Sequence, residues 1–264
     1  MLSRESFAQR FGRKAIFGMV HIRALPGAPL FGGSIDEVID AAIADAGALV
    51  AGGCDGIVFE NFGDRPFRKH VDPETVASMT RLITECAPRI TIPFGVNVLR
   101  NDARAALAVA AATGASFIRI NIHVGAMSTD QGIIEGEAAD TVRLRATLAP
   151  GVLIFADHLV KHATPIGEYS ARDLRERGLA DVIIISGRET GTPADAGRLA
   201  SVRREVDAPL VIGSGLTAEN AATYADADGA IVGTSVKRDG RIEMPVDPLR
   251  VERVVRAFKQ LAGR

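Results

Sequence analysis

The chain has 264 residues, of which 47% are apolar and 24% charged, and its formal net charge is -1 at pH 7. This length and apolar content suit one large α/β domain with a substantial core, so we expect a single domain over residues 1–264. The near-neutral charge disfavours a nucleic-acid partner, since such binders gather a basic excess on one face. The two cysteines, Cys54 and Cys86, lie far apart without metal-ligand spacing and fit a reducing cytosol.

No segment of the sequence is typical of a secretory signal or of a transmembrane helix. Charged residues recur from Arg4 to Lys14, where a secretory signal would need an uninterrupted apolar segment. The most apolar stretch, residues 105–112, is too short to span a bilayer. We therefore expect a cytoplasmic protein without a transmembrane segment.

Short apolar segments rich in β-branched residues alternate eight times with helix-like segments along the chain. Continuous apolar character indicates strands covered on both faces, as in a parallel sheet wrapped by helices. The predicted strands are residues 15–21, 56–60, 92–98, 117–122, 152–157, 182–186, 210–213 and 230–233. Eight strand–helix units favour an α/β fold of the closed (β/α)8 or TIM-barrel type over an open doubly wound sheet.

Residues that can satisfy the free amides of a first turn mark the expected helix starts. Ser34 with Glu37 forms a candidate capping box. The other expected caps, several of them preceding a proline, are Asp72, Asp102, Thr192, Thr217 and Asp247. Gly114 and Gly178 are expected to end helices in the left-handed conformation.

Two glycine-containing turns each follow one of the last two predicted strands. In a (β/α)8 barrel, loops at these positions point main-chain N–H groups at a phosphate, and glycine lets the backbone approach closely. The expected phosphate-binding residues are Gly213, Ser214, Gly215, Gly233, Thr234 and Ser235, together with Gly187 after the sixth strand. The alternative is that these glycines only turn the chain between strand and helix.

Polar residues also gather at the C-terminal ends of the predicted strands, where a barrel carries its active site. Such groups cost burial energy unless a ligand, a metal or an internal network satisfies them. The predicted ring comprises His21, Glu60, Asn61, Asn97, Arg119, Asn121, His123, Asp157, His158 and Ser186. We interpret it as the mouth of an active site.

Within this ring Asp157 is the preferred general base, with Glu60 as its partner, because carboxylates in different environments can divide acid and base roles. His21 and His123 complete the predicted catalytic set. The alternative for Asp157 is an ion pair with Arg119 or Lys161. The predicted substrate-binding residues are Asn61, Asn97, Arg119, Asn121, His158, Lys161 and Ser186.

The cofactor stays open at this stage. Glu60, His123 and Asp157 are candidate ligands for a divalent metal such as zinc or manganese, although no two histidines share a metal-binding motif. Flavin mononucleotide, whose phosphate such barrels hold at the same turns, is less favoured. A Schiff-base mechanism is disfavoured because no predicted strand contains a lysine, and Lys161 lies beyond a strand end.

Two loops at the predicted mouth invite a functional interpretation. Residues 123–137 contain three glycines and suit a lid that closes over the mouth, with a rigid loop as the alternative. Residues 61–67 suit a substrate loop, in which Asp64 and Arg65 either bind ligand or pair with each other.

Long, unusual strings across nearly the whole chain resemble the BtpA/SgcQ family of (β/α)8 proteins. The strings lie at residues 18–27, 60–67, 97–102, 129–136, 156–157 with 160–163, 186–187 with 190–191, the glycine turn at 213, and 233–237. The resemblance implies two competing roles. The family takes its name from a peripheral protein needed for photosystem I accumulation, whereas other members resemble proteins of sugar or nucleoside catabolism.

Together these patterns predict a cytosolic (β/α)8 enzyme, a homo-oligomer, acting on a phosphorylated small molecule. A phosphosugar or phosphorylated nucleoside fragment is the expected substrate, and hydrolase, lyase and isomerase chemistry all remain open. The rival is a non-catalytic peripheral factor for the biogenesis or stability of membrane protein complexes. The lack of a basic amphipathic helix with a bulky apolar face argues against that rival.

Overall fold

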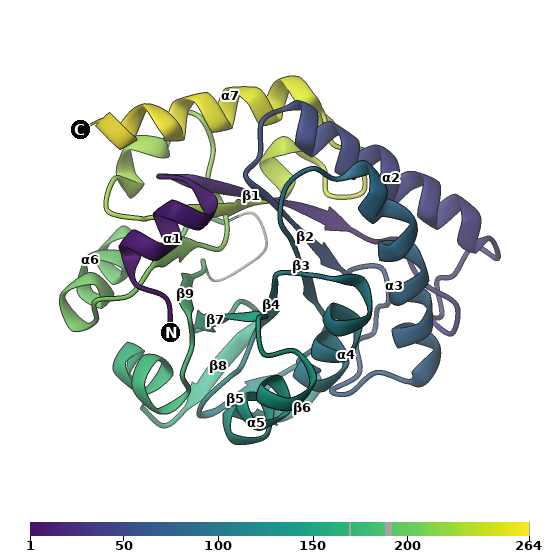
Figure 1. Ribbon diagram of the computed structural model, residues 1–264, viewed down its shortest axis with the longest axis horizontal. Coiled ribbons are helices and arrows are strands. Elements are labelled where there is room, and N and C mark those ends of the chain that lie inside the picture. Colours follow the sequence, from purple (N-terminus) through teal and green to yellow (C-terminus); the bar gives the residue numbers. More distant parts are fainter. Residues whose placement is uncertain (169, 188–191, 264) are drawn as a thin grey trace.

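The structure, a computed structural model, describes residues 1–168, 170–187 and 192–263. Within them, eight parallel strands close into a barrel in the order β1-β11-β10-β9-β7-β4-β3-β2 (Figure 1). The strands are β1 (Ala15–His21), β2 (Gly56–Glu60), β3 (Phe94–Asn97), β4 (Phe117–Ile120), β7 (Leu153–His158), β9 (Val182–Ile185), β10 (Leu210–Ile212) and β11 (Gly229–Val232). The predicted barrel is confirmed, and each strand lies where its apolar segment predicted it.

Helices surround the barrel in Figure 1, where α1 lies across one end of it and the others lie around the outside. They are α1 (Arg4–Phe11), α2 (Ile35–Ala51), α3 (Pro73–Cys86), α4 (Ala103–Thr113), α5 (Ala138–Leu148), α6 (Ala196–Glu205) and α7 (Pro248–Lys259). After β7 and β10 the described chain forms shorter turns, a π-helical one at Asp173–Arg177 and a 3-10 one at Ala221–Tyr224. Among the described residues, no helix has the length and apolar character needed to cross a membrane.

Three of the six predicted helix caps are confirmed, whereas Asp72 precedes α3 without a side-chain capping hydrogen bond and the 3-10 turn after Thr217 begins only at Ala221. Ser34 accepts a hydrogen bond from the amide of Glu37, and Asp102 and Asp247 cap α4 and α7 in the same way. The predicted cap at Thr192 is wrong. Instead α6 begins after Asp195, whose carboxylate accepts hydrogen bonds from two amides of the first turn.

The two predicted helix-ending glycines behave differently. Gly114 adopts the left-handed conformation, with φ of 77°. Gly178 does not, because its φ is -83° and the next residue, Leu179, carries the positive φ instead. Glycine is still required at 178, since a Cβ there would lie 2.8 Å from the carbonyl oxygen of Leu174. Close packing, and not a backbone conformation, explains this glycine.

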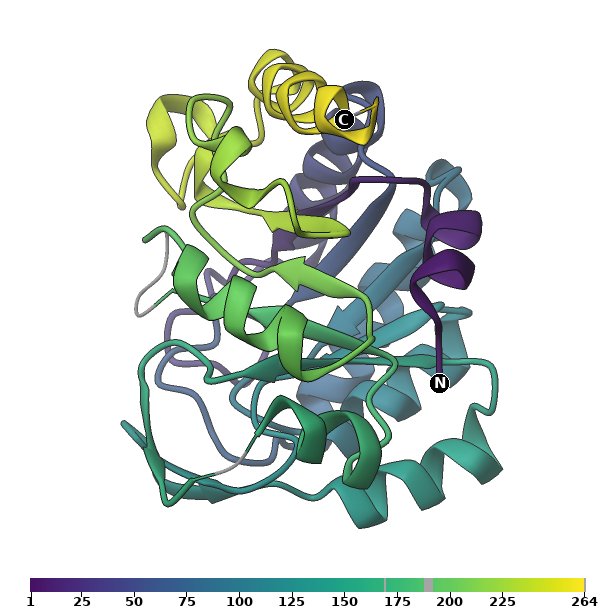
Figure 2. The same ribbon diagram turned by 90° about the vertical axis from the view of Figure 1, so that its left-hand side faces the viewer.

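The N-terminal end of the barrel is closed by α1, which lies at one end of the strands (Figure 2). Phe7 and Phe11 from this helix are buried among aromatic side chains of the barrel interior. Phe11 packs 5.2 Å from Phe17, and Phe117 stacks on Phe155 with ring centroids 4.3 Å apart. Burial of each such ring stabilises the fold by roughly 1.5–3 kcal/mol. A ligand therefore has to approach from the opposite end.

A three-stranded antiparallel sheet stands at that opposite end, built from loops after β4 and β7. Its strands are β5 (Ala126–Thr129), β6 (Gly132–Glu135) and β8 (Ala163–Ile166), in the order β6-β5-β8. Met127 and Ile134 are buried against Ile122 and Val160. The segment predicted as a lid is thus a packed hairpin, which matches the rigid alternative.

Candidate active site

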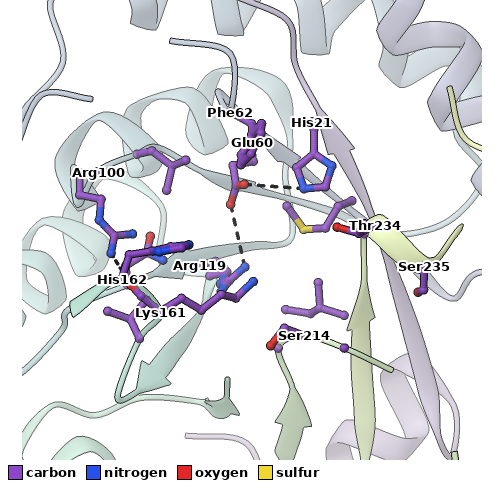
Figure 3. A pocket seen from close by; sticks show the side chains of 18 of the residues that line it. His21, Glu60, Phe62, Arg100, Arg119, Lys161, His162, Ser214, Thr234 and Ser235 are labelled. Atoms are coloured by element: carbon purple, nitrogen blue, oxygen red, sulfur yellow. Dashed lines mark hydrogen bonds and ion pairs between the residues drawn. The ribbon is translucent and has the colours of Figure 1, made fainter. Parts of the chain in front are cut away.

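A cavity of about 540 Å³ opens at the C-terminal ends of the barrel strands. Figure 3 shows side chains from several strands pointing into it. The strands contribute His21 (β1), Glu60 (β2) and Arg119 (β4) to the lining. The loops that follow them contribute Arg100 after β3, Asn121 after β4, Lys161 after β7, and both glycine turns. Four residues of the predicted ring, His21, Glu60, Arg119 and Asn121, therefore meet at the end of the barrel where the fold predicts a site.

The two glycine turns converge on this cavity. Gly213, Ser214 and Gly215 after β10 line it together with Gly233, Thr234 and Ser235 after β11, and these strands are neighbours in the barrel. Among the described residues, the main-chain amides of Ser214, Gly215, Thr234 and Ser235 donate no hydrogen bond within the protein. Such amides, left free at strand-to-helix corners, are the groups that hold an anion in other folds.

Glycine is required at two positions of these turns. Gly215 has φ of 71°, and a Cβ on it would lie 2.4 Å from backbone atoms of Pro193. A Cβ on Gly233 would lie 2.8 Å from Cε1 of His21. The absence of these side chains allows the backbone and the imidazole to border the same space.

One predicted phosphate contact is already in use. The amide of Gly187 donates a hydrogen bond of 2.8 Å to Oγ of Ser214, which in turn donates to the carbonyl oxygen of Thr192. This chain ties the loop after β9 to the turn after β10, so the Gly187 amide is not free to hold a ligand. Residues 188–191, part of one family-like string, lie outside the described residues.

Glu60 is the carboxylate that faces the cavity. The residue is 6% exposed, and its Oε2 accepts a hydrogen bond of 2.6 Å from Nδ2 of Asn97. Nε2 of His21 lies 3.9 Å from Oε1, and Nη1 of Arg119 lies 3.9 Å from Oε2. Figure 3 shows Glu60 between these two partners. One oxygen is thus held in place while the carboxylate borders the ligand space.

His21 is neutral in this environment. Burial lowers the pKa of His21 well below its ordinary value, and the positive charges of Lys237, Lys161 and Arg119 lower it further. The ring packs edge-on against Phe62, with centroids 4.9 Å apart, and Nδ1 is buried without a hydrogen-bond partner. A neutral imidazole with a free ring nitrogen can exchange a hydrogen bond with a ligand.

Asp157, the preferred base in the sequence analysis, does not line the cavity. The residue is fully buried and accepts hydrogen bonds of 2.8 and 3.1 Å from Arg119 and one of 2.6 Å from Oγ of Ser186. The ion-pair alternative therefore describes its geometry. Asp157 holds the guanidinium of Arg119 in a fixed orientation at the cavity.

Lys161 and Arg100 are the features that sequence reasoning undervalued. Burial lowers the pKa of Lys161 to about 8, helped by the nearby positive charge of Arg119 and partly opposed by Glu60 and Asp157. Lys161 lines the cavity from the loop after β7, in keeping with its predicted place beyond a strand end, whereas its lowered pKa had no signal in the sequence. Arg100 follows β3 directly, so its position after a strand was the available signal.

Three predicted site residues lie elsewhere. His123 bonds the carbonyl oxygen of Gly178 at 2.7 Å, and burial lowers its pKa to about 4. His158 lines a separate pocket beside β8. Asn61 accepts a hydrogen bond from the amide of Leu99 and donates to Asp64, so it holds two loops together. None of these three residues lines the cavity.

The candidate metal ligands do not converge. Among the described residues, no three His, Cys, Asp or Glu side chains are grouped so that they could hold a metal ion. Glu60 faces the cavity, Asp157 is bound to Arg119, and His123 bonds a carbonyl oxygen.

In the predicted substrate loop, Asp64 accepts a hydrogen bond from the amide of Leu25, and Arg65 stacks over the ring of Phe62. Asp64 and Arg65 therefore do not pair with each other.

The fold and the cavity define a (β/α)8-barrel protein with a polar, cation-rich mouth. The chain belongs to the BtpA family, whose model matches residues 12–260. It is 44% identical over 252 residues to the photosystem I biogenesis protein BtpA of Synechocystis, covering 93% of this chain and 88% of that protein. It is 35% identical over 247 residues to the putative sgc region protein SgcQ of Escherichia coli, covering 90% and 91%. The predicted family is confirmed.

A solved structure supports the fold. N-(5'-phosphoribosyl)anthranilate isomerase from Pyrococcus furiosus superimposes with a TM-score of 0.54 over 94% of this chain and 99% of that chain. The two sequences are 15% identical, so the likeness concerns the barrel architecture.

Proposed function

We propose that the protein is an enzyme that acts on a phosphorylated small molecule, a phosphosugar or a phosphorylated nucleoside fragment, bound in the barrel mouth. The observation that carries the proposal is the joint lining of one cavity by both glycine turns, with unpaired amides, and by Glu60. Anchoring a phosphate on one wall converts binding energy into orientation of the reacting bond. The phosphorylated substrate named for the isomerase of similar fold is consistent with this use of a barrel.

Glu60 is the proposed general acid or base. It is the carboxylate that borders the ligand space, and Asn97 fixes one of its oxygens. Lys161, with its pKa lowered to about 8, is a second group able to exchange a proton near neutral pH. Oδ1 of Asn121 and Nδ1 of His21 are buried without partners and are suited to bind substrate hydroxyl groups. Hydrolase, lyase and isomerase chemistry each fit these groups.

A thermal-shift screen of phosphorylated sugars and nucleosides against their dephosphorylated counterparts tests the anchoring. Phosphate esters should raise the melting temperature by mass action, and the dephosphorylated compounds should not. A screen in which no phosphate ester shifts melting, with or without divalent metal, would contradict the proposal. We place this activity in the cytoplasm and expect the purified enzyme to be a homo-oligomer.

A second function, in membrane-complex biogenesis, is favoured by one observation, the name of the Synechocystis relative at 44% identity. On this view the barrel binds a protein partner at a membrane surface without turnover. Co-sedimentation with native membranes, followed by cross-linking to a complex subunit, tests it. Recovery of the protein solely in the supernatant argues against this role.

A further inference from the structure

We propose that the ligand carries a second anionic group, a carboxylate or another phosphate, which binds Arg100 and Lys161 on the wall facing the phosphate turns. This inference rests on the proposed function, because it assigns the other end of the same ligand. It adds a substrate class, namely small molecules with acidic groups at both ends.

The barrel topology separates the two anion sites. In the strand order β1-β11-β10-β9-β7-β4-β3-β2, β3 stands opposite β10, and β7 stands opposite β1, the neighbour of β11. Arg100 follows β3, and Lys161 follows β7. Figure 3 shows these two side chains on one side of the cavity and Thr234 and Ser235 on the other. A single phosphate held by the glycine turns would leave the first wall unoccupied.

Among the described residues, no carboxylate forms an ion pair with the cations on that wall. Among the described residues, Nζ of Lys161 makes neither a hydrogen bond nor an ion pair. Arg100 is 6% exposed, and its Nε is buried without a hydrogen-bond partner. Its Nη2 donates a hydrogen bond of 2.6 Å to the carbonyl oxygen of Lys161, and this bond fixes the guanidinium beside the lysine. A buried arginine beside a half-buried lysine is costly unless an anion joins them.

The carboxylates nearby do not supply that anion. Asp157 is fully engaged by Arg119 and Ser186. Glu60 is held by Asn97, and Nη1 of Arg119 lies 3.9 Å from its Oε2. The groups facing Lys161 are Arg119 on β4, Glu60 on β2, Asp157 on β7 and Arg100 after β3. Asp130 also favours the charged form of Arg100, but among the described residues no hydrogen bond or ion pair joins the two side chains. Both Arg and Lys are suited to carboxylate or phosphate oxygens.

Matched ligand pairs test the second site by isothermal titration. The pairs are glucose 6-phosphate with 6-phosphogluconate, and fructose 6-phosphate with fructose 1,6-bisphosphate. The doubly anionic member of at least one pair should bind about tenfold more tightly or better, because each charge-assisted contact strengthens binding by at least that factor. The first pair reports a carboxylate and the second a phosphate, so the preferred pair identifies the group.

Variants locate the effect. Arg100→Gln and Lys161→Met should each reduce the preference toward unity. Arg100→Lys, which keeps the charge, should retain part of the preference and guards against a folding artefact. The exposed Arg68→Gln is the matched control and should behave as wild type.

The outcomes separate the two proposals. Monophosphates that bind without any preference for the doubly anionic partner, or a preference that survives both Arg100→Gln and Lys161→Met, overturn this inference and leave the proposed function standing. Failure of every phosphate ester to bind removes both.

Discussion

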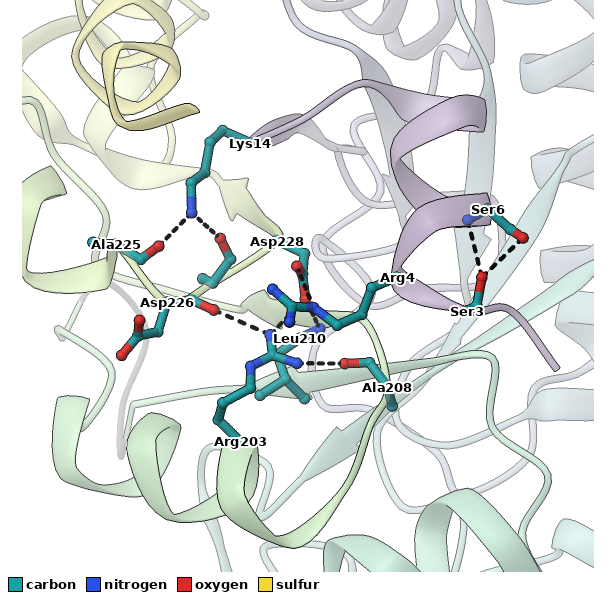
Figure 4. Close-up of polar contacts among 11 residues, drawn as sticks. Ser3, Arg4, Ser6, Lys14, Arg203, Ala208, Leu210, Ala225, Asp226 and Asp228 are labelled. Carbon is teal, nitrogen blue, oxygen red and sulfur yellow. Dashed lines mark hydrogen bonds and ion pairs between the residues drawn. The ribbon is translucent and has the colours of Figure 1, made fainter. Parts of the chain in front are cut away.

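The two ends of the barrel use the same kinds of residue in opposite ways. At the N-terminal end Asp228 accepts hydrogen bonds from Arg4 and Arg203, and Lys14 donates to the carbonyl oxygens of Ala225 and Ala227 (Figure 4). At the C-terminal mouth, Lys161 lacks such a partner among the described residues. Paired charges stabilise a fold, whereas unpaired ones in a cavity are held ready for a ligand.

The contrast teaches which substitutions should affect stability and which should affect ligands. The N-terminal end also carries the aromatic plug of α1, so its losses should appear as unfolding. Losses at the mouth should appear in turnover and affinity while the protein stays folded. Each experiment below tests one side of this division.

Glu60→Gln should have the largest effect. Glutamine keeps an oxygen acceptor for Asn97 but cannot transfer the proton, so turnover on the substrate found by screening should fall by about 10²–10⁴-fold. Affinity for the phosphate ester should change little. Steady-state kinetics with titration of the same variant checks this, and Glu135→Gln, an exposed carboxylate on β6, is the matched control. Undiminished turnover would remove Glu60 from the mechanism.

Phe7→Ala tests the closed end. Phe7 is fully buried against Phe11 and Phe17, so its truncation should lower the free energy of unfolding by about 3–5 kcal/mol. Ligand affinity of the remaining folded protein should be unchanged. Urea titration measures the loss, with the exposed Leu249→Ala as control. Equal stabilities of the two variants would show that α1 does not plug the barrel.

The barrel could be predicted because its signal is local. Each strand, such as β2 or β11, is a continuous apolar segment, and the caps Ser34 and Asp102 lie directly before their helices. The predictions that were wrong depended on contacts between residues far apart in the sequence. Leu179 takes the left-handed conformation that was expected of Gly178, which packs against Leu174 and Val124, and no local pattern reports that packing.

The candidate site divides in the same way. The positions of His21, Glu60 and the two glycine turns follow from the rule that strand ends meet at one mouth, and the structure places them there. The pairing of Asp157 with Arg119 joins residues 38 positions apart, and strand-end position alone does not reveal which carboxylate faces ligand. Lys161 was undervalued because its loop, paired through β8 with β5, brings it back over the mouth.

The buried His123 gives the scaffold a pH dependence. Its pKa is lowered from 6.5 to about 4 in the folded state, so unfolding takes up a proton between those values and the folded state loses stability as pH falls below about 6.5. From pH 7.5 to 4.5 this residue should account for about 2–3 kcal/mol of lost stability. Urea titrations across that range should show a shallower decline for His123→Gln. The exposed His70→Gln is the control, and parallel curves for His123→Gln and wild type would contradict the assignment.

The smallest stability effect should come from Lys161→Met, and this sharpens the comparison of the two ends. Methionine keeps the apolar stem and removes a cation that pairs with no other described residue, so the free energy of unfolding should change by less than about 1 kcal/mol. Lys14→Met, in contrast, leaves two carbonyl oxygens without their donor and should cost about 1–3 kcal/mol.

The same two variants should differ in how their ligand affinity depends on pH. In wild type, affinity for a doubly anionic ligand should fall as pH rises through about 8, because Lys161 loses its charge, and a bound anion moves that midpoint upward. Lys161→Met should abolish this dependence, whereas Lys14→Met should preserve it. A pH dependence that persists in Lys161→Met would assign the titration to another group and return Lys161 to the scaffold, where it would resemble Lys14 at the closed end.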